Sequence, residues 1–429
     1  MVSCDGRKPW SPSTTTGLSH LPPGALQQMK LPALLAALAA SVLVVACAQD
    51  SGATAPQDDT ADVQARVDAG GMVTFDARLY RLSRTIVISR SGTTIQGAGP
   101  GTRFVFQPRL PQIQCVNDRA FTTPCELVAV PRRQIIAPIA PGDLSFQVLD
   151  DVSDLQPGDW LIVTEKDRLI GDVIAIDWAQ VDQINGHSVA VRSPFRSTFS
   201  VARSWDPDFS GLGFRKLPRL VQNVSFLNFS LSVPDSGQNA PGISVFAAMH
   251  TLISGVRVDD ANGQAFYSYL SENLAIHNST GNSGLGINEL ASTVDLEVSG
   301  NTLTSDTNAG LGLDLGSGFF SVSANLIAKS YNAGIYLLYG VHDGSLTNNN
   351  IAPVQVQGGT SAIGILARGT QATTVTNNTL AGGDGAASLG ISIGPAYQGE
   401  VTIPSHSNVI APNDFGPAWS MDYDPTNAP

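Results

Sequence analysis

Short runs of alternating apolar and polar residues, separated by turns of glycine, asparagine and serine, make up most of this chain. The runs are rich in β-branched side chains, which is typical of short β-strands. One stretch differs, because residues 61–70 place Val63 and Val67 on one helical face, and Thr60 or Asp62 can cap it. The pattern therefore predicts an all-β protein with one short helix near its N-terminus.

Two sequence markers recur with one period in the second half of the chain. An asparagine beside a strand recurs at intervals of 23, 24, 24, 29 and 30 residues, and a glycine before alternating apolar residues recurs at 44, 24, 24, 30 and 26. This period is too short for a propeller blade of ~40 residues, and it lacks the pattern of helical solenoids. The asparagines are Asn278, Asn301, Asn325, Asn349, Asn378 and Asn408, and the glycines are Gly242, Gly286, Gly310, Gly334, Gly364 and Gly390.

A coil of this length, stacked ~4.8 Å above the previous coil, fits a single-stranded parallel β-helix, or solenoid. Inward-facing Val, Ile and Leu would form one continuous core. The recurring asparagines would hydrogen-bond from coil to coil as a ladder. Because side chains alternate along a strand, a slip of one residue would invert every inward and outward assignment.

The repeat does not cover the whole chain. Residues 108–220 contain strand signals and an Asn185-Gly186 turn but no such period, so we interpret them as a β-rich excursion from the helix. Trp178 and Trp205 could line a sugar site there, or they could be apolar anchors. The predicted divisions are 1–28 as a non-native or dispensable leader, 29–46 as a signal peptide, 47–60 as a flexible tether, 61–107 as the N-terminal cap and first coils, 108–220 as the excursion, 221–410 as regular coils and 411–429 as a C-terminal cap or tail.

The sequence VQARVDAGGMVTFDARLYRLSRTIVISRSGTTIQGAG, at residues 63–99, resembles the opening of the pectate-lyase-like right-handed parallel β-helix superfamily. Members of that superfamily often begin with a short capping helix. The resemblance covers about residues 61–107, and it implies a right-handed coil rather than a particular activity. The later coils also resemble the parallel β-helix repeats of carbohydrate-binding and sugar-hydrolase proteins.

The N-terminal region is predicted to be an export signal. Residues 31–46 are apolar throughout, follow Lys30, and are short for a membrane span. They end at Cys47 in a sequence that resembles a bacterial lipobox, which implies a lipid-anchored protein of the cell envelope. An ordinary secretory signal is the alternative, and Met29 is a candidate start.

Export also bears on the remaining cysteines. Cys115 and Cys125 are separated by a polar, loop-like segment. In an oxidising compartment we expect a disulfide between them, with two buried free thiols as the alternative.

Composition and charge exclude several classes of protein. The chain has 429 residues, of which 42% are hydrophobic, so it is not wholly disordered. Its net charge is -12, and without residues 1–46 it has 21 basic and 35 acidic residues, or -14. Such a chain is not expected to bind nucleic acid or an anionic membrane non-specifically. Asp259-Asp260 lacks the further ligands of a calcium loop and the six histidines have no zinc spacing, so no metal or cofactor is expected.

One candidate site lies on the strand before each recurring asparagine. There Arg257, Asp259, His277, Asp295 and Glu297 are predicted to face outward. In register, Asp259, His277 and Glu297 would form a column with ~5 Å between neighbours. Asp295 and Glu297 would lie ~7 Å apart, which suits two carboxylates that activate a water. A solvated face of an acidic protein is the alternative.

A second candidate site lies on the strand after each glycine. Tyrosine rings stack on sugars, and Asp, Asn and Arg bind hydroxyl and carboxylate groups. Glu289 breaks the alternation, which indicates either a register slip or an inward carboxylate. His342-Asp343, in the adjoining turn, could be a base with its orienting carboxylate or ordinary turn residues. The side chains predicted to face outward are Tyr267, Tyr269, Asn288, Asp314, Tyr336 or Tyr339, and Arg368.

These residues favour chemistry on a polysaccharide. Elimination from a uronate needs a base for the proton beside the carboxylate and a cation to neutralise that carboxylate. The candidate catalytic residues are Asp259, His277, Asp295, Glu297, Asp314 and Arg368, and the candidate substrate-binding residues are Tyr267, Tyr269, Asn288, Tyr336 and Tyr339.

Motifs of related enzymes do not assign these roles. Polygalacturonase-like hydrolases carry Asn-x-Asp, Asp-Asp, Gly-His-Gly and Arg-x-Lys, of which only Asp259-Asp260 is present, and the Asp-Pro-His-Asp of mannuronan epimerases is absent. We therefore expect an exported β-helix that acts on an extracellular polysaccharide, as a lyase more than as a hydrolase. A non-catalytic glycan-binding or surface-structural solenoid is the alternative. A third hypothesis is a periplasmic accessory protein for metal-site maturation, against which the lack of Cys, His and Met clusters counts. Membrane contact is expected through the lipid only, and the oligomeric state stays open.

Overall fold

The computed structural model describes most of the chain after residue 56. The described residues are 57–107, 119–169, 172–208, 210–234, 241–261, 263–284, 288–356, 361–383, 388–396, 402–416, 419 and 421–424. The predicted leader, signal peptide, Cys47 and Cys115 lie outside these residues, so the lipid anchor and the disulfide stay predictions. Within the described part, no helix is both long and apolar enough to cross a membrane.

A short helix, α1 (Thr60–Ala69), opens the described chain, as predicted. Val63 and Val67 are buried against the first coils, and Gly70, with φ of 72°, ends the helix. The predicted cap was wrong, because the side chain of Asp58 accepts the hydrogen bond from the backbone N–H of Thr60, at 3.1 Å.

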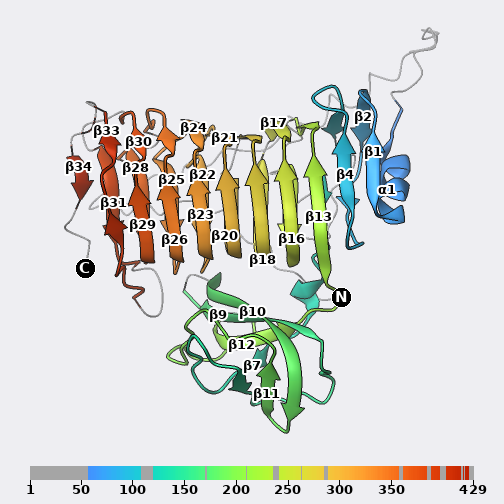
Figure 1. Cartoon of the computed structure of the whole chain (residues 1–429), viewed down its shortest axis with the longest axis vertical. Helices are drawn as coiled ribbons and strands as arrows, with labels where there is room; N and C mark the ends of the chain where they lie inside the picture. Colours follow the sequence, from blue (N-terminus) through green and yellow to red (C-terminus); the bar gives the residue numbers. More distant parts are fainter. Residues whose placement is uncertain are drawn as a thin grey trace, which may run out of the picture. The chain divides into compact units, whose positions relative to one another are not determined.

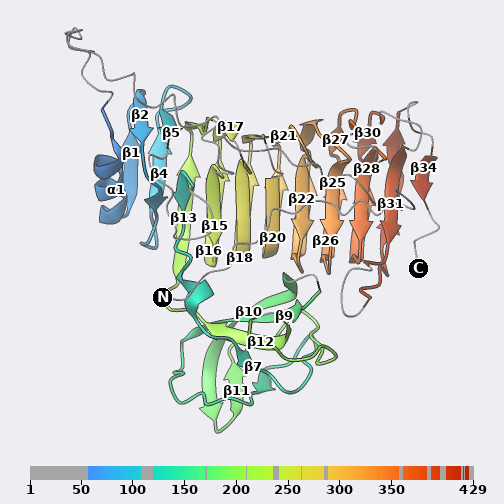
Figure 2. The same ribbon diagram turned by 180° about the vertical axis from the view of Figure 1, so that it is seen from behind.

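The chain then winds into coils of three strands, and each strand pairs in parallel with its counterpart in the next coil (Figures 1 and 2). The first strands are β3 (Ile86–Val87), β6 (Phe121–Thr122), β15 (Ile243–Phe246), β22 (Leu311–Asp314), β25 (Ala333–Leu338), β28 (Ile363–Arg368), β31 (Leu389–Gly394) and β34 (Met421–Asp424). The second strands are β1 (Met72–Phe75), β4 (Thr94–Gly97), β13 (Val221–Leu227), β16 (Ala248–Ser254), β23 (Gly318–Ser323), β26 (His342–Thr347), β29 (Gln371–Thr376) and β32 (Val409–Ile410). In two coils, β18 (Phe266–His277) and β20 (Asn288–Ser299) supply both the first and the second strand.

The third strands form a separate ten-stranded parallel sheet that closes each coil. They are β2 (Leu79–Leu82), β5 (Arg103–Phe106), β14 (Ser230–Ser232), β17 (Arg257–Ala261), β19 (Thr280–Ser283), β21 (Thr302–Ser305), β24 (Leu326–Lys329), β27 (Asn350–Ile351), β30 (Thr379–Leu380) and β33 (Asp414–Phe415). The predicted right-handed parallel β-helix with an N-terminal capping helix is therefore confirmed.

One apolar core runs through the coils from end to end. Stacked aliphatic side chains such as Ile335, Ile365 and Ile391 occupy one inward position in successive first strands, because those strands pair in register. Alternation within each strand puts the intervening residues outside. At the C-terminal end Trp419 packs on this core, and its indole N–H donates to the carbonyl oxygen of Leu380 at 3.0 Å.

An asparagine ladder lies at the corner between the second and third strands. The side-chain amide of Asn301 donates to Asn325 Oδ1 at 2.9 Å, and the same contact continues through Asn349 and Asn378 to Asn413. Each Oδ1 also accepts the backbone N–H of the preceding ladder residue. Because the first four members are at most 1% exposed, the ladder satisfies polar backbone groups that water cannot reach.

Two of the six predicted ladder residues were wrong. Asn278 occupies the preceding corner position, where φ is 48°, and Ser279 takes the ladder position instead. Asn408 binds backbone groups of Thr370 and Thr373 outside the ladder. Asparagine tolerates a left-handed backbone and also forms ladders, so the residue type alone does not distinguish adjacent positions.

The excursion leaves the coils after β6 and returns at β13, between a first and a second strand (Figures 1 and 2). It contains an antiparallel six-stranded sheet with its own apolar core, as expected for a β-rich excursion. The excursion also holds the 3₁₀ helix η1 (Glu126–Ala129), and the Asn185-Gly186 turn closes its β10–β11 hairpin. In spatial order its strands are β7 (Arg133–Gln134), β12 (Gly211–Lys216), β9 (Trp160–Asp167), β10 (Asp172–Asn185), β11 (Ser188–Val191) and β8 (Ser145–Gln147).

Asn349→Ala is expected to lower the free energy of unfolding by more than about 2 kcal/mol, because it leaves buried donors of Asn325 unpaired. Asn350→Ala, at the exposed neighbouring position, is the matched control and should change stability by less than about 0.5 kcal/mol. Denaturant unfolding checks both variants. Equal losses in the two variants would show that the ladder does not stabilise the coils.

Candidate functional site

The excursion packs on the corner where first strands pass into second strands. Side chains from both parts share one apolar cluster, in which Ile176 and Trp178 of β10 lie with Tyr269 and Val294 of the coils. The contact between the two parts is close. A Cβ atom at Gly316 would lie only 2.6 Å from the backbone of Ile174.

This packing builds an acidic face on the outward side of the first strands. Tyr269, Ala291 and Asp314 occupy the same outward position in three successive coils. Asp172, at the start of β10, accepts a hydrogen bond from the Tyr269 hydroxyl. The small side chain of Ala291 leaves space between Tyr269 and Asp314, so the excursion carboxylate lies within electrostatic range of Asp314.

Asp314 is a buried carboxyl group of this face. Its side chain is 8% exposed, and within the described residues its Oδ1 has no hydrogen-bond partner. Burial raises the pKa of Asp314 well above its ordinary value, and the nearby carboxylates of Glu289 and Asp172 raise it further. Burial and the neighbouring carboxylates therefore both favour the protonated form of the Asp314 carboxyl group.

Two tyrosines, Tyr336 and Tyr339, lie near Asp314 on this face. Burial, followed by the charges of Asp314 and Glu289, raises the pKa of Tyr336 well above its ordinary value. Burial and then Asp314 also raise the pKa of Tyr339. Both rings stay neutral, and Tyr336 shares its outward position with Gly312, Glu289 and Tyr267 of the three preceding coils.

The predicted register was wrong by one residue in one coil. Asn288, predicted to face outward, points into the core, where its amide donates to the carbonyl oxygen of Gly310 at 2.8 Å. Glu289 faces outward instead, and the amide of Gln264 donates to it at 3.2 Å. The break in alternation at Glu289 was the only sequence signal for this carboxylate.

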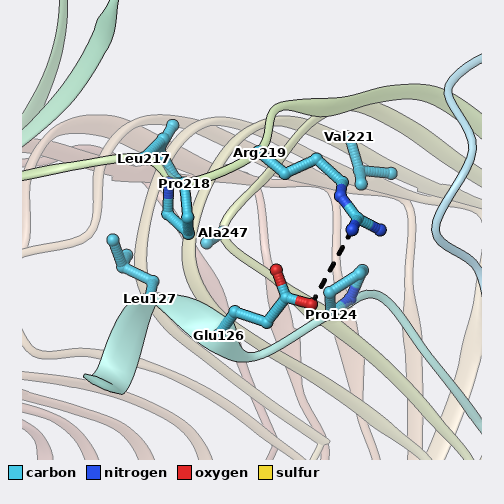
Figure 3. A pocket seen from close by; sticks show the side chains of 8 residues that line it. All are labelled: Pro124, Glu126, Leu127, Leu217, Pro218, Arg219, Val221 and Ala247. Atoms are coloured by element: carbon cyan, nitrogen blue, oxygen red, sulfur yellow. Dashed lines mark ion pairs between the residues drawn. The ribbon is translucent and has the colours of Figure 1, made fainter. Parts of the chain in front are cut away.

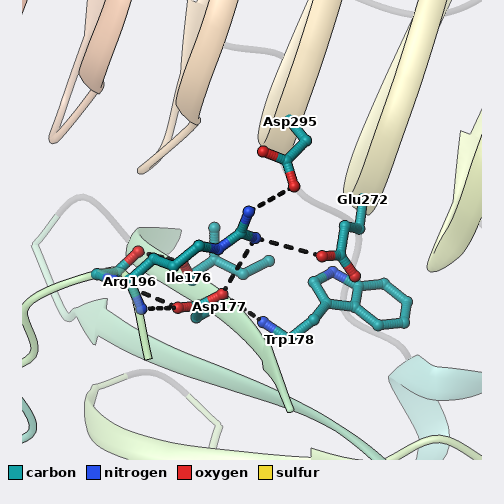
Figure 4. Close-up of polar contacts among 7 residues, drawn as sticks. Ile176, Asp177, Trp178, Arg196, Glu272 and Asp295 are labelled. Atoms are coloured by element: carbon teal, nitrogen blue, oxygen red, sulfur yellow. Dashed lines mark hydrogen bonds and ion pairs between the residues drawn. The ribbon is translucent and has the colours of Figure 1, made fainter. Parts of the chain in front are cut away.

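A second polar cluster joins the excursion to the coils through one guanidinium group (Figure 4). Arg196 contacts the carboxylates of Asp177 at 3.5 Å, Glu272 at 3.2 Å and Asp295 at 2.5 Å. Its guanidinium carbon lies 4.7 Å from the ring centroid of Phe319. Three carboxylates therefore share one cation at this contact.

Glu272 is the member of this cluster with the most altered titration. The pKa of Glu272 is raised to about 7, and burial is the largest cause. The charge of Arg196 opposes the rise, and the charges of Asp295 and Asp177 add to it. Met249 and Val294 flank it in the adjoining coils, which accounts for the dry environment.

The predicted column of Asp259, His277 and Glu297 was wrong. Asp259 belongs to β17 in the third-strand sheet, where it pairs with Arg257 at 2.8 Å. His277 and Glu297 do meet, at 3.1 Å, but as diagonal neighbours on the second strands. Asp295 adopts φ of 52°. Its carboxylate contacts Arg196 of the excursion, whereas Glu297 contacts His277.

The remaining predicted residues divide between the acidic face and other contacts. Tyr267 lies on this face, 5.3 Å from the guanidinium of Arg119. Arg368 shares the outward position of Asp314 two coils further on, and it donates to Ser392 at 2.8 Å. His342 and Asp343 form a local pair at 2.9 Å, which lowers the pKa of Asp343.

Two surface hollows of the described residues are relevant to ligand binding. One, of about 10 Å³, is lined by the segments that leave and rejoin the coils, beside the Glu126–Arg219 ion pair at 4.0 Å, and it is too small for a ligand (Figure 3). The other, of about 250 Å³, lies on the excursion and is lined in part by Trp205. Trp178, in contrast, is 7% exposed in the contact with the coils, so it is an apolar anchor.

The Arg196 cluster predicts a pH dependence for the docking of the excursion. The folded-state pKa of Glu272 is raised from 4.5 to about 7. The contribution of this shift to the free energy of unfolding is therefore complete below about pH 4.5 and is lost as the pH rises through 7. Glu272→Gln should remove this dependence of the thermal midpoint and of amide exchange in β9 and β10. Glu297→Gln, whose side chain is 55% exposed, should leave the dependence intact. A pH profile unchanged in Glu272→Gln would contradict the assignment.

Several solved structures are similar to this chain. The tailspike gp61 of Pseudomonas phage phi297 is 14% identical over 80% of this chain and 57% of its own length, with a TM-score of 0.47. The gp54 tailspike of Acinetobacter baumannii bacteriophage AP22, solved with a capsular saccharide, is 12% identical over 86% of this chain and 74% of its own, at 0.41. The A-module of the Azotobacter vinelandii mannuronan C-5 epimerase AlgE4 is 12% identical over 86% and 94%, also at 0.41. No curated protein sequence matches the chain.

A family model described as "Periplasmic copper-binding protein (NosD)" matches residues 222–426. Copper favours thiolate, thioether and imidazole ligands. In the part of the chain that the structure describes, no three His, Cys, Asp or Glu side chains come together as metal ligands.

The family match covers coils that carry all three parallel strands and the asparagine ladder. The capping helix and the first coils precede it, as the opening sequence predicted. The chain thus has the fold of a right-handed parallel β-helix, and its regular coils are similar to those described by the NosD family model.

Proposed function

We propose that this protein is exported and cleaves a polysaccharide bound across the outward face of its first strands, with Asp314 as the proton donor. The carboxyl group of Asp314 carries this proposal, because it is buried, has an unpaired Oδ1 and lies beside other carboxylates. Such a perturbed group outside the core is a candidate for acid–base chemistry.

The chemistry is hydrolysis of a glycosidic bond. Asp314, whose raised pKa favours the protonated form, gives its proton to the leaving glycosidic oxygen. A water attacks the sugar carbon from which that oxygen departs, and Glu289 of the preceding coil accepts the water's proton. The pairing resembles other sites where environment separates the roles of two carboxyl groups.

The charge of the face indicates the class of sugar. The carboxylates of Asp172 and Glu289 both raise the pKa of Asp314, so they would also repel a uronate carboxylate bound there. The half-buried rings of Tyr267 and Tyr336 can stack on pyranose faces. A neutral glycan therefore fits better than the uronate polymer that β-elimination requires.

Elimination remains the second candidate because of one observation. Arg368 occupies the outward position of Asp314 two coils away, at ~10 Å along the stack, and it could neutralise a uronate carboxylate. Export is supported by the predicted signal sequence and by the description of the matching family as periplasmic. Lipidation of Cys47 stays part of the proposal.

Asp314→Asn is expected to lower the rate of glycan cleavage by at least roughly 100-fold, because asparagine cannot donate the proton. In the unmodified protein, activity should fall as the pH rises through the raised pKa of Asp314, because the donor is lost. Asp306→Asn, which changes an exposed carboxylate paired with Lys329, is the matched control and should keep full activity.

The assay uses the full-length protein with a galactomannan, a dextran and a polygalacturonate, and it records reducing ends and ultraviolet absorbance. Reducing ends without absorbance support hydrolysis, whereas absorbing unsaturated ends would establish the lyase. Binding without either product would leave a glycan-binding solenoid and overturn the enzymatic proposal. Full activity in Asp314→Asn would remove Asp314 from the mechanism.

A further inference from the structure

The excursion carries a hollow of about 250 Å³ that belongs to none of the sites described above. Its walls come from β7, β12 and the segment between β11 and β12, and the coils contribute none of its lining residues. The chemistry of these walls combines one aromatic ring, exposed aliphatic side chains and an amide. We propose that this hollow is a second glycan-binding site, which holds a neutral pyranose unit against the ring of Trp205.

The backbone of β12 is shaped around this ring. A Cβ atom at Gly213 would lie 2.7 Å from ring atoms of Trp205, and one at Gly211 would lie 3.1 Å from the ring. Two glycines therefore allow the indole to rest directly on the strand. Arg132, buried and bonded to backbone carbonyl oxygens, lies 5.1 Å from the ring centroid and supports it from within the excursion. A ring held in this way loses little freedom when it binds a ligand.

The other wall residues suit the two kinds of surface on a sugar. Ile136 and Val201 are 49% and 45% exposed, and they can contact the apolar C–H face of a pyranose. Within the described part of the chain, neither the side-chain amide of Gln134 nor the indole N–H of Trp205 makes a hydrogen bond, so both can bind hydroxyl groups.

The charges around the hollow favour a neutral ligand. Arg203, in the wall, contacts Glu165 and lies 3.0 Å from Asp167, and all three side chains are at most 7% exposed. The one charged side chain in the wall is therefore compensated within the excursion, which suits an uncharged ligand. The size of the hollow suits a sugar unit rather than a protein segment.

A glycan held here would be bound to the same compact unit of the chain as Asp314. The excursion that contains Trp205 also supplies Asp172 to the acidic face. Binding at two places on one polymer raises the effective concentration of the second contact. The inference concerns binding alone, so it does not depend on cleavage at Asp314.

The test measures binding of dextran and galactomannan, with polygalacturonate for comparison, to the full-length Asp314→Asn protein by affinity electrophoresis and calorimetry. Trp205→Ala in that background should weaken binding of a neutral glycan at least tenfold, and Gln134→Ala should weaken it several-fold. Leu144→Ala, at an apolar excursion residue that is 53% exposed and outside the hollow, should have no effect. With Asp314 restored, Trp205→Ala should cleave a short oligosaccharide at the normal rate.

The outcomes separate this inference from the proposed function. Unchanged neutral-glycan binding in both Trp205→Ala and Gln134→Ala, or tighter binding of polygalacturonate than of either neutral glycan, would overturn the second site and leave the role of Asp314 intact. If Trp205→Ala does not fold, Gln134→Ala alone decides, because its side chain makes no hydrogen bond to any residue that the structure describes. Full cleavage by Asp314→Asn together with loss of binding in Trp205→Ala would overturn the catalytic proposal and support the second site.

Discussion

The structure depends on hydrogen bonds between strands that lie in register in successive coils. Each coil must return to the same path, so every corner has to repeat one backbone conformation. Residues with φ near +50° accordingly recur at equivalent corners, at Asn228, Asn278, Asn348 and Asn377 before the third strands. Where the next position is an asparagine, its side chain satisfies the corner backbone, and the coils cannot shift relative to one another without breaking the ladder.

This constraint explains which features could be predicted from the sequence. A coil imposes its period on residue types, so the asparagine and glycine intervals predict both the parallel pairing and its length. The capping helix has local signals in Val63 and Val67, and the excursion shows itself as a stretch without the period. The same regularity placed Asp314 and Tyr336 on the outward face, since their strand alternates without interruption.

The errors arise where two residue types can serve adjacent positions, or where contacts are long-range. Asn288 and Glu289 were exchanged because an asparagine can lie inside a solenoid when the core supplies partners, and here Ser283 and Gly310 do so. Asp172 and Arg196 gave no signal at all. They act through contacts with coils about a hundred residues away, and an antiparallel excursion has no period that predicts where it packs.

The place of the excursion in the chain makes the acidic face composite. It is inserted between a first and a second strand, so it emerges at the corner beside Tyr269, and its strand β10 is held against the coils by Arg196 and by the apolar cluster around Trp178. A regular solenoid would expose Asp314 to water and let it ionise. Covered by the excursion and placed near Asp172, the same side chain is dry and electrostatically disfavoured as an anion. The chemical character of the face is therefore a property of the insertion and the coils together, and neither part has it alone.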